Sequence, residues 1–193
     1  MSTVVHAPEV KAQRLTTPAD PPKPWLLPAV LVAVIFAVYA ATLRFEFVYD
    51  DNFQIVGNTW LSWRFVPRYF TQHLWAFAGI SGTYWRPVQL LWFLVQRIMF
   101  GVNPVGWHAA TVGVHALVAV LACFLTRRLT GDRAAGLIAG LVFALHPALI
   151  ESVAWVSGVA DPLLSVFLIG AFLACLKWRD TGKRSWLAAA LAL

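Results

Sequence analysis

Long stretches without lysine or arginine, each close to the length of a membrane-crossing helix, are the feature that most limits how this chain can fold. The stretches occupy, in order, residues 25–43, 105–126, 134–149, 159–176 and 186 onward. The first has 19 residues and as a helix would cover about 28 Å, close to the thickness of the hydrocarbon core of a bilayer. The pattern predicts an all-α integral membrane protein with about five transmembrane helices.

The composition supports the membrane class and argues against nucleic-acid binding. Of the 193 residues, 60% are hydrophobic and 12% are charged, whereas a soluble domain usually carries about a quarter charged residues. The net charge of +6 comes from basic residues that bracket the apolar stretches instead of forming one surface. Bracketing of this kind sets membrane topology and is not typical of a phosphate-binding face. We therefore expect no nucleic-acid partner.

The distribution of basic residues predicts the orientation of the chain. Residues 1–24 are polar and proline-rich, which predicts a disordered cytoplasmic tail before a membrane domain over 25–193. Two further basic clusters lie at 127–133 and 177–184. The positive-inside rule places these clusters on the same side as the tail. The chain is thus predicted to be a multi-pass protein of the cell membrane with its N-terminus in the cytoplasm.

Both basic clusters fall inside only if residues 86–100 do not cross the membrane. That segment is short for a span, and it carries Gln89, Gln96 and Arg97. It is therefore predicted to be an interfacial helix on the outer surface. A large external loop, residues 44–104, then joins the first two spans.

The external loop begins with a candidate catalytic pair, Asp50 and Asp51. Two adjacent carboxylates cannot both ionise freely at close range, so one of the pair could have a raised pKa and act as a base. The alternative is structural, because Asp51 and Asn52 could cap a helix or turn after the first span. The spacing leaves both interpretations open.

A second external turn gathers His146, Glu151, Trp155 and Asp161 within 16 residues. If the segment after Glu151 is helical, Glu151 and Trp155 share one face. The alternative is an ordinary loop in which Asp161 is the N-cap of the fourth span and Pro162 its first residue. We keep the cap interpretation for Asp161 even if the rest of the turn is functional.

Three further side chains are candidates for binding. His108 and His115 are seven residues apart and so lie on nearly one face of the second span. An ionisable group in mid-membrane, such as His115, is a functional candidate, although a neutral imidazole bonded to a neighbouring helix is an equal alternative. Arg86 could hold a lipid phosphate, since a guanidinium matches phosphate oxygens in a bidentate manner. Simple anchoring at the interface explains Arg86 equally well.

Taken together, these motifs resemble the N-terminal membrane half of the transmembrane and tetratricopeptide-repeat O-mannosyltransferases, which have the GT-C glycosyltransferase fold. The resemblance covers about residues 25 to 193. It rests on four segments in order: Phe47-Val48-Tyr49-Asp50-Asp51, Tyr84-Trp85-Arg86-Pro87, Asn103-Pro104 through Trp107-His108 to His115, and His146-Pro147 through Glu151-Ser152-Val153-Ala154-Trp155-Val156-Ser157-Gly158 to Asp161. The last segment is the most specific of the four.

The resemblance implies a membrane enzyme that moves a sugar, commonly mannose, from a polyprenyl-phosphate donor to a Ser or Thr hydroxyl of an acceptor protein. It carries the catalytic base over to Asp50 or Asp51. The expected substrate-binding residues are Arg86, His108, His115, His146, Glu151, Trp155 and Asp161. The spacing of the acidic and histidine side chains fits no metal-ligand template, so no metal or other cofactor is assigned.

Two other function classes remain open at this stage. A transporter or channel segment would place coupling groups near the midplane, where only His115 lies, and a non-catalytic membrane scaffold would leave the external carboxylates unexplained. The chain ends inside an apolar stretch, so we expect it to be the N-terminal piece of a longer, GT-C-like protein whose tetratricopeptide repeats follow.

Overall fold

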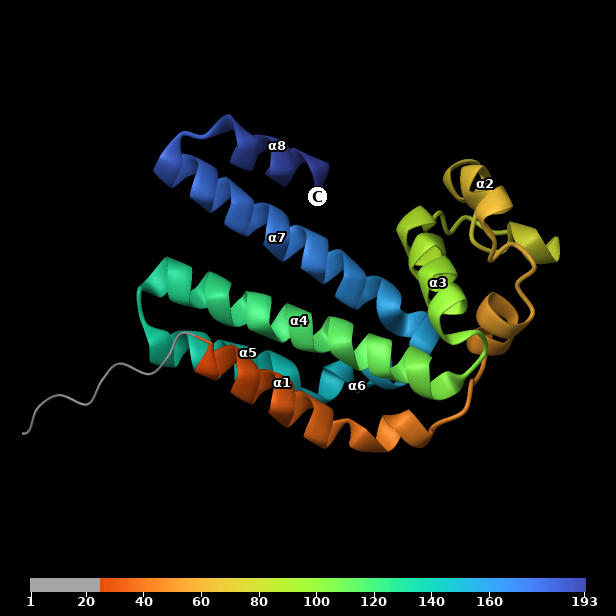
Figure 1. The fold of residues 1–193 in the computed structure, drawn as a ribbon, viewed down its shortest axis with the longest axis horizontal. Helices are drawn as coiled ribbons and strands as arrows, with labels where there is room; N and C mark the ends of the chain where they lie inside the picture. Colours follow the sequence, from red (N-terminus) through yellow and green to blue (C-terminus); the bar gives the residue numbers. More distant parts are fainter. Residues whose placement is uncertain (1–24) are drawn as a thin grey trace, which may run out of the picture.

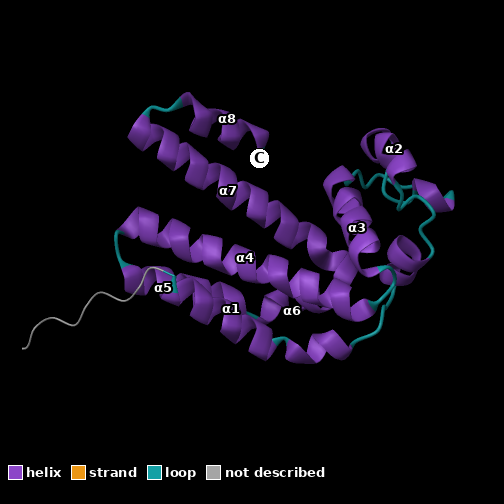
Figure 2. Ribbon diagram, in the orientation of Figure 1, coloured by secondary structure: helices purple, strands orange, loops and turns teal. Residues whose placement is uncertain are grey.

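The computed structural model describes residues 25–193, and the predicted cytoplasmic tail lies outside these described residues. Every regular element among them is helical and none is a strand (Figure 2). The α-helices are α1 (Leu26–Val38), α2 (Val66–Thr71), α3 (Pro87–Phe100), α4 (Pro104–Thr130), α5 (Arg133–Leu145), α6 (Ile150–Ala154), α7 (Ala160–Thr181) and α8 (Arg184–Ala192). The predicted all-α membrane class is confirmed.

The predicted spans differ in how closely their helices match the thickness of a bilayer. Among the described residues, α4 and the stretch Val156–Thr181 are long and apolar enough to cross a membrane. A third crossing exists if α5 and the segment Pro147–Ala154, which are bent by 52° relative to each other, form one broken span. Helices α1 and α8 have 13 and 9 residues. The predicted first span, residues 25–43, corresponds to two shorter elements, α1 and the 3₁₀ helix Ala40–Arg44.

Helix α4 is central to the bundle and packs against α1, α5 and α7 (Figure 1). Local signals fix its ends, since Asn103 caps its first turn by accepting from the Val105 N–H at 3.1 Å. Gly131 ends it with a φ of 75°, a left-handed conformation that favours glycine. Helix α5 ends at Leu145 because Pro147 cannot continue the helical hydrogen bonds.

The long helices alternate in direction along the bundle (Figure 1). Residue 25, the α4–α5 turn and the α7–α8 turn therefore lie at one end. The 3₁₀ helix after α1, the start of α4, the end of α5 and the start of α7 lie at the other. Helix α3 runs across the direction of α4 and α7 and does not change this alternation, as expected for a segment that is not a parallel span.

Close contact between α4 and α5 depends on two small residues. A Cβ at Gly136 would lie 2.8 Å from the Cys123 carbonyl oxygen, and one at Gly140 would lie 3.1 Å from the Cys123 Cβ. Gly136 and Gly140 form a Gly-x-x-x-Gly pattern, which lets two membrane helices approach closely. We call this contact the glycine seam.

The predicted external loop is folded around its own core. Its buried side chains include Ile55, Leu61, Tyr69, Leu74 and Phe93, and they form one cluster with Trp107 of α4 and with Val156 and Val159 before α7. The Tyr69 hydroxyl donates to the Trp60 carbonyl at 2.5 Å, and burial raises the pKa of Tyr69 to about 12. Arg97 of α3 donates to the Ile55 carbonyl at 3.0 Å. The loop is thus fixed on the end of the bundle where α4 begins and α5 stops.

Candidate functional site

Asp51 joins the two segments that the sequence singled out. Its Oδ1 accepts from the Ser157 N–H at 2.8 Å and from the Ser157 hydroxyl at 2.6 Å. Its Oδ2 accepts from the Val48 N–H at 3.3 Å. The residue has no exposed surface. The aspartate pair and the turn after His146 therefore meet at one end of the bundle.

Burial makes the Asp51 carboxyl harder to ionise than a carboxyl in water. Burial raises its pKa above the usual 3.8, while the hydrogen bonds from Ser157 and Val48 and the nearby His108 ring lower it. Desolvation is the largest of these causes. The sequence argument, which relied on repulsion between adjacent carboxylates, gave the wrong cause for the shift.

Asp50 has a different environment although it is the next residue. It is partly exposed, and its Oδ2 accepts from the Gln54 side chain at 3.2 Å. The preceding residue, Tyr49, has a φ of 47°, which is an uncommon conformation for a residue other than glycine. Backbone strain of this kind is concentrated at functional sites. The strained turn places the carboxylates of Asp50 and Asp51 in different environments, one partly exposed and one buried.

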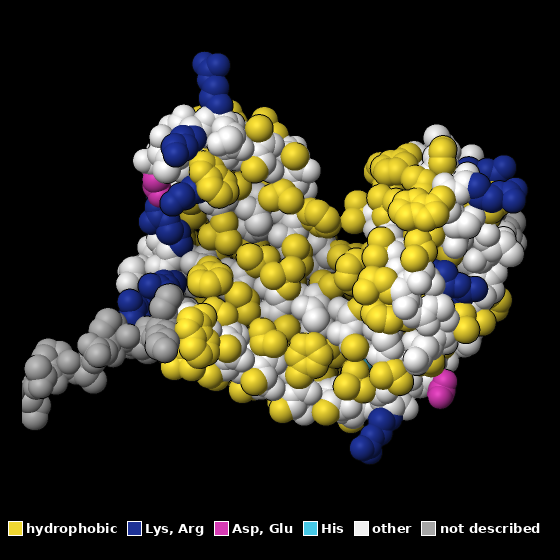
Figure 3. Space-filling view, viewed as in Figure 1, with side chains coloured by type: hydrophobic (Ala, Val, Ile, Leu, Met, Phe, Trp, Pro, Cys, Tyr) yellow, Lys and Arg dark blue, Asp and Glu magenta, His cyan; other side chains and the backbone are white. Residues whose placement is uncertain are grey.

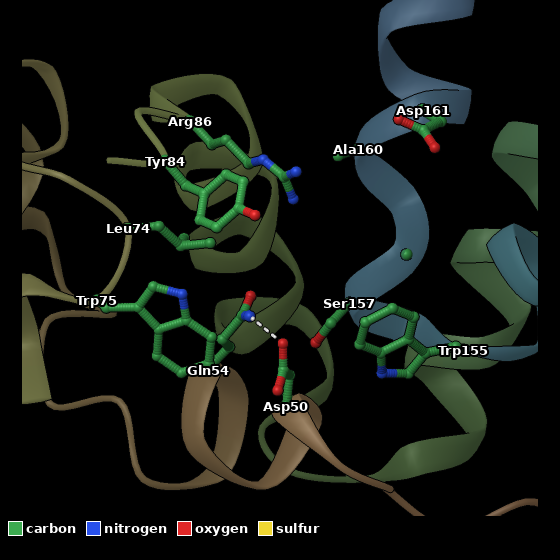
Figure 4. A pocket seen from close by; sticks show the side chains of 11 residues that line it. Asp50, Gln54, Leu74, Trp75, Tyr84, Arg86, Trp155, Ser157, Ala160 and Asp161 are labelled. Atoms are coloured by element: carbon green, nitrogen blue, oxygen red, sulfur yellow. Dashed lines mark hydrogen bonds between the residues drawn. The ribbon is translucent and has the colours of Figure 1, made fainter. Parts of the chain in front are cut away.

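The Asp50 carboxylate lies at a polar cavity of about 250 Å³ between the external loop and the start of α7 (Figure 4). Arg86 and Asp161 line the same cavity, on the α3 side and the α7 side. The other lining residues are Gln54, Leu74, Trp75, Tyr84, Trp155, Ser157, Gly158 and Ala160. A cation and two carboxylates therefore face one space that is large enough for a small polar group.

A second, mainly apolar cavity of about 590 Å³ adjoins the first. Asp50 and Trp155 line both cavities, and Glu151 lines only the second. The predicted helical turn is present as α6, and the backbone N–H of Trp155 donates to the Glu151 carbonyl at 3.0 Å. The Trp155 indole N–H has no hydrogen-bond partner within the described chain. This indole nitrogen is buried, so it is a polar atom that the described chain leaves unsatisfied.

Two side chains, Tyr84 and Gln89, contact the Arg86 guanidinium. The guanidinium lies 5.1 Å from the centre of the Tyr84 ring and donates to the Gln89 side chain at 3.4 Å. Neither ion pair found among residues 25–193 includes Arg86. A guanidinium carries five N–H donors, so most of them remain free for an anion.

The three candidate histidines lie outside both cavities. His115 is buried in α4 and bonds to the Ala144 carbonyl at 3.1 Å, which matches the structural alternative given for it. His108 is also buried in α4, beside the Phe45 ring and close to Asp51. His146 is exposed, and its Nδ1 accepts from the Ala148 N–H at 3.2 Å. His146 thus caps the turn after α5.

The prediction that Asp161 caps the fourth span is wrong. Helix α7 begins at Ala160 and has no side-chain cap, so Asp161 and Pro162 lie inside its first turn. The preceding 3₁₀ helix, Val156–Val159, extends the helical turns further toward the N-terminus than the Asp-Pro signal indicates. The Asp161 carboxylate is consequently free to face the polar cavity (Figure 4). A carboxylate in the first turn is also favoured by the helix dipole.

Similar proteins carry a consistent name. Protein O-mannosyl-transferase Tmtc1 of Drosophila melanogaster is 33% identical over 145 residues, which are 73% of this chain and 17% of that protein. Protein O-mannosyl-transferase TMTC1 of Mus musculus is 30% identical over 179 residues, or 86% of this chain and 19% of that protein. Drosophila Tmtc2 is 33% identical over 81% of this chain and 18% of its own length. The chain is a homologue of the protein O-mannosyl-transferases.

This relationship confirms the resemblance seen in the sequence. The chain spans less than a fifth of the length of the O-mannosyl-transferases that it matches. No family model matches it. No solved structure matches it either.

Sequence reasoning missed three polar residues of this O-mannosyl-transferase homologue. Gln54, Gln89 and Ser157 are each at most 3% exposed and are hydrogen-bonded to one another or to the aspartate pair. Gln89 did give a signal, because a polar side chain on a mainly apolar helix usually has a hydrogen-bond partner when it is buried. Nothing in the sequence indicated which partner.

No group of three or more His, Cys, Asp or Glu side chains suited to holding a metal ion occurs in the described part of the chain.

Proposed function

We propose that this chain carries part of the active site of a GT-C-like membrane glycosyltransferase. The enzyme moves a sugar, mannose by analogy with the names of its relatives, from a polyprenyl-phosphate donor to a Ser or Thr hydroxyl of an acceptor protein. The observation that carries the proposal is that Asp50 and Arg86 line one cavity. A base and an anion-binding cation are the two groups that this transfer requires.

Asp50 is the better candidate for the base. Its carboxylate lies at both cavities and accepts one side-chain hydrogen bond, from Gln54. Asp51 has no exposed surface and both of its oxygens already accept hydrogen bonds. A base must reach the proton that it removes, so Asp51 acts here as the support that joins the external loop to the turn before α7.

The reaction can be written with the residues at hand. The acceptor oxygen attacks the anomeric carbon while Asp50 takes its proton, and the bond from that carbon to the phosphate oxygen breaks. Negative charge builds on the departing lipid phosphate, and Arg86 provides N–H donors for it. Asp161 and Glu151, which line the two cavities, can stabilise the positive charge that develops on the sugar ring.

An apolar groove supports a lipid-linked donor. About 560 Å³ of space lies between α3, α4 and α7, lined by residues such as Trp92, Val114 and Phe167. Figure 3 shows hydrophobic side chains around the hollow between α3 and α7. A polyprenyl tail leaves an apolar environment at a cost of about 0.8 kcal/mol for each CH₂ group. The groove would keep the tail in apolar surroundings while the phosphate reaches Arg86.

The site is proposed to face the exterior of a cell membrane, with the N-terminus in the cytoplasm. Arg127, Arg128, Lys177 and Arg179 lie at the end of the bundle away from Asp50, where Figure 3 shows a cluster of basic side chains. Basic residues are concentrated in cytoplasmic loops of membrane proteins. The cavities at the opposite end would then be extracellular.

The test uses the full-length protein that contains this segment, with a polyprenyl-phosphate mannose donor and a Ser/Thr acceptor peptide. We expect Asp50→Asn to lower transfer by about 100-fold or more, as for loss of a general base. Asp180→Asn, at the opposite end of the bundle, is the matched control and should leave transfer unchanged. Full activity of an Asp50→Asn, Asp51→Asn double variant would contradict the proposal.

A further inference from the structure

We infer that Gln54 and Gln89 are positioning residues that hold the base Asp50 and the cation Arg86 on one hydrogen-bonded chain. The inference rests on the proposed glycosyl transfer and adds two residues to its machinery. Neither glutamine touches the reacting atoms in this arrangement. Each acts through the charged side chain at its end of the chain.

The chain runs without a gap from cation to carboxylate. Arg86 Nη1 donates to Gln89 Oε1 at 3.4 Å, and Gln89 Nε2 donates to Gln54 Oε1 at 3.4 Å. Gln54 Nε2 then donates to Asp50 Oδ2 at 3.2 Å, the bond drawn in Figure 4. Both glutamines are 3% exposed. Arg86, Gln54 and Asp50 line the polar cavity, whereas Gln89 does not.

The direction of the hydrogen bonds is the same at every step. Each amide presents its oxygen toward the guanidinium and its N–H₂ group toward the carboxylate. Dipoles arranged in this order strengthen one another, and the low polarity of a buried site increases the effect. The arrangement fixes which oxygen of Asp50 is occupied. Oδ2 is held by Gln54, so Oδ1 is the oxygen left for an acceptor hydroxyl.

A branch of the chain connects it to the buried aspartate. Gln89 Nε2 also donates to the Ser157 carbonyl at 3.1 Å, and the N–H and hydroxyl of Ser157 donate to Asp51. Gln89 therefore links α3, the external loop and the turn before α7. Movement of any of the three would change the separation of Arg86 and Asp50.

An amide suits this role because it keeps its hydrogen-bonding pattern at every working pH. The charged or titratable groups that share a cavity with Asp50 are Arg86, Tyr84 and Asp161 in the first cavity and Tyr49 and Glu151 in the second. A carboxylate at position 54 would be a further negative charge within hydrogen-bonding distance of Asp50. It would have to share a proton with Asp50 and so move the pH at which the base becomes active.

The first experiment measures kcat and the KM for the lipid-linked donor in the full-length protein. We expect Gln54→Leu to lower kcat by about 10-fold or more, because misplaced reacting groups slow the chemical step. Gln89→Leu should chiefly raise the KM for the donor, because it releases Arg86. Gln96→Leu is the matched control, since Gln96 is buried one heptad further along α3 and has no hydrogen-bond partner among the described residues. It should leave both constants unchanged.

The second experiment separates positioning from general loss of structure. Gln54→Glu should move the acidic limb of the pH profile of kcat/KM to higher pH, and its rate should recover toward that of the unsubstituted protein above the new midpoint. A purely structural role would lower the rate by the same factor at every pH.

The outcomes distinguish this inference from the proposed function. If the unsubstituted protein transfers sugar but the Gln54 and Gln89 variants keep its kcat, KM and pH profile, positioning is wrong and glycosyl transfer stands. Equal losses in the Gln96 control would also overturn positioning. If the unsubstituted protein transfers no sugar from the lipid donor, both proposals fail.

Discussion

The two ends of the helical bundle are held together by different physical means. At the site end, around Asp50 and Asp51, buried polar side chains bond across segments that are up to 106 residues apart in the chain. At the glycine seam, near the opposite end, α4 and α5 approach so closely that an added Cβ would lie 2.8 Å from a carbonyl oxygen. The site end is stabilised by hydrogen bonds between buried polar groups, whereas the glycine seam needs glycines so that the backbones of α4 and α5 can approach each other.

The difference shows why only one end is suited to chemistry. Apolar close packing leaves no room for a ligand and no free donor or acceptor. Buried polar groups must each find a partner, and the network that satisfies Gln54, Gln89 and Asp51 also fixes the side chains lining the cavity. Two cavity residues, Arg86 and Asp50, each make one side-chain hydrogen bond in this network and keep hydrogen-bonding capacity that a substrate could use.

Removing the buried Asp51 carboxylate should cause the largest loss of stability. We expect Asp51→Ala to lower the free energy of unfolding by about 2–4 kcal/mol, because it leaves the donors of Ser157 and Val48 without an acceptor. Thermal unfolding of the detergent-solubilised protein measures this loss. Asp50→Ala is the matched control and should cost less than about 1 kcal/mol, since Asp50 is partly exposed. Equal losses for the two would mean that the neighbours do not differ as described.

The glycine seam should be sensitive to a single methyl group. We expect Gly136→Ala to destabilise the protein by about 1–3 kcal/mol, because the new Cβ would meet the Cys123 carbonyl oxygen and the Arg127 Cβ. Gly113→Ala in α4 meets nothing within 4 Å. It should be neutral or stabilise by about 0.5–1 kcal/mol through helix propensity. A stabilising Gly136→Ala would argue against close packing at the seam.

The pH dependence of stability should include a contribution from Asp51. Its raised pKa means that the folded state binds this proton more tightly than the unfolded state does, so the contribution is complete below 3.8 and is lost as pH rises through the raised value. We expect Asp51→Asn to remove this part of the dependence when unfolding is followed across a pH series. Identical pH profiles for the two proteins would exclude a raised pKa.

The exposed ion pairs near the glycine seam should matter least. Asp180 pairs with Arg128 of α4 and with Arg179, and these side chains are between 34% and 68% exposed. Solvent screens such pairs, so Asp180→Asn should change the free energy of unfolding by less than about 1 kcal/mol. The change should shrink further in unfolding experiments at high salt. A large, salt-independent loss would mean that this end also depends on polar contacts.

Local patterns made much of the fold predictable. Pro147 lies just after the end of α5, where a proline cannot continue the helical hydrogen bonds, and an apolar stretch must leave water whatever it packs against. The polar residues of 86–100 predicted an interfacial helix, and α3 runs across the direction of the long helices (Figure 1). The glycine seam was not predicted, because a Gly-x-x-x-Gly pattern indicates a close helix contact only when the partner helix is known.

The candidate site was predictable only in part. The sequence brought Asp50, Arg86, Trp155 and Asp161 forward as candidates, and the structure has them at one cavity. It could not separate Asp50 from Asp51, since neighbours in sequence share every local signal. The positive φ of Tyr49 and the hydrogen bonds from Ser157 separate them.

The sequence by itself determined the class of this protein: a helical membrane chain that is related to the protein O-mannosyl-transferases. Those properties follow from hydropathy, charge and helix-ending residues, which act over a few turns. Only the tertiary structure decided which carboxylate is buried, which reaches a cavity, and that two glutamines link it to Arg86. Burial and hydrogen-bond partners depend on residues distant in the chain, and no local pattern records them.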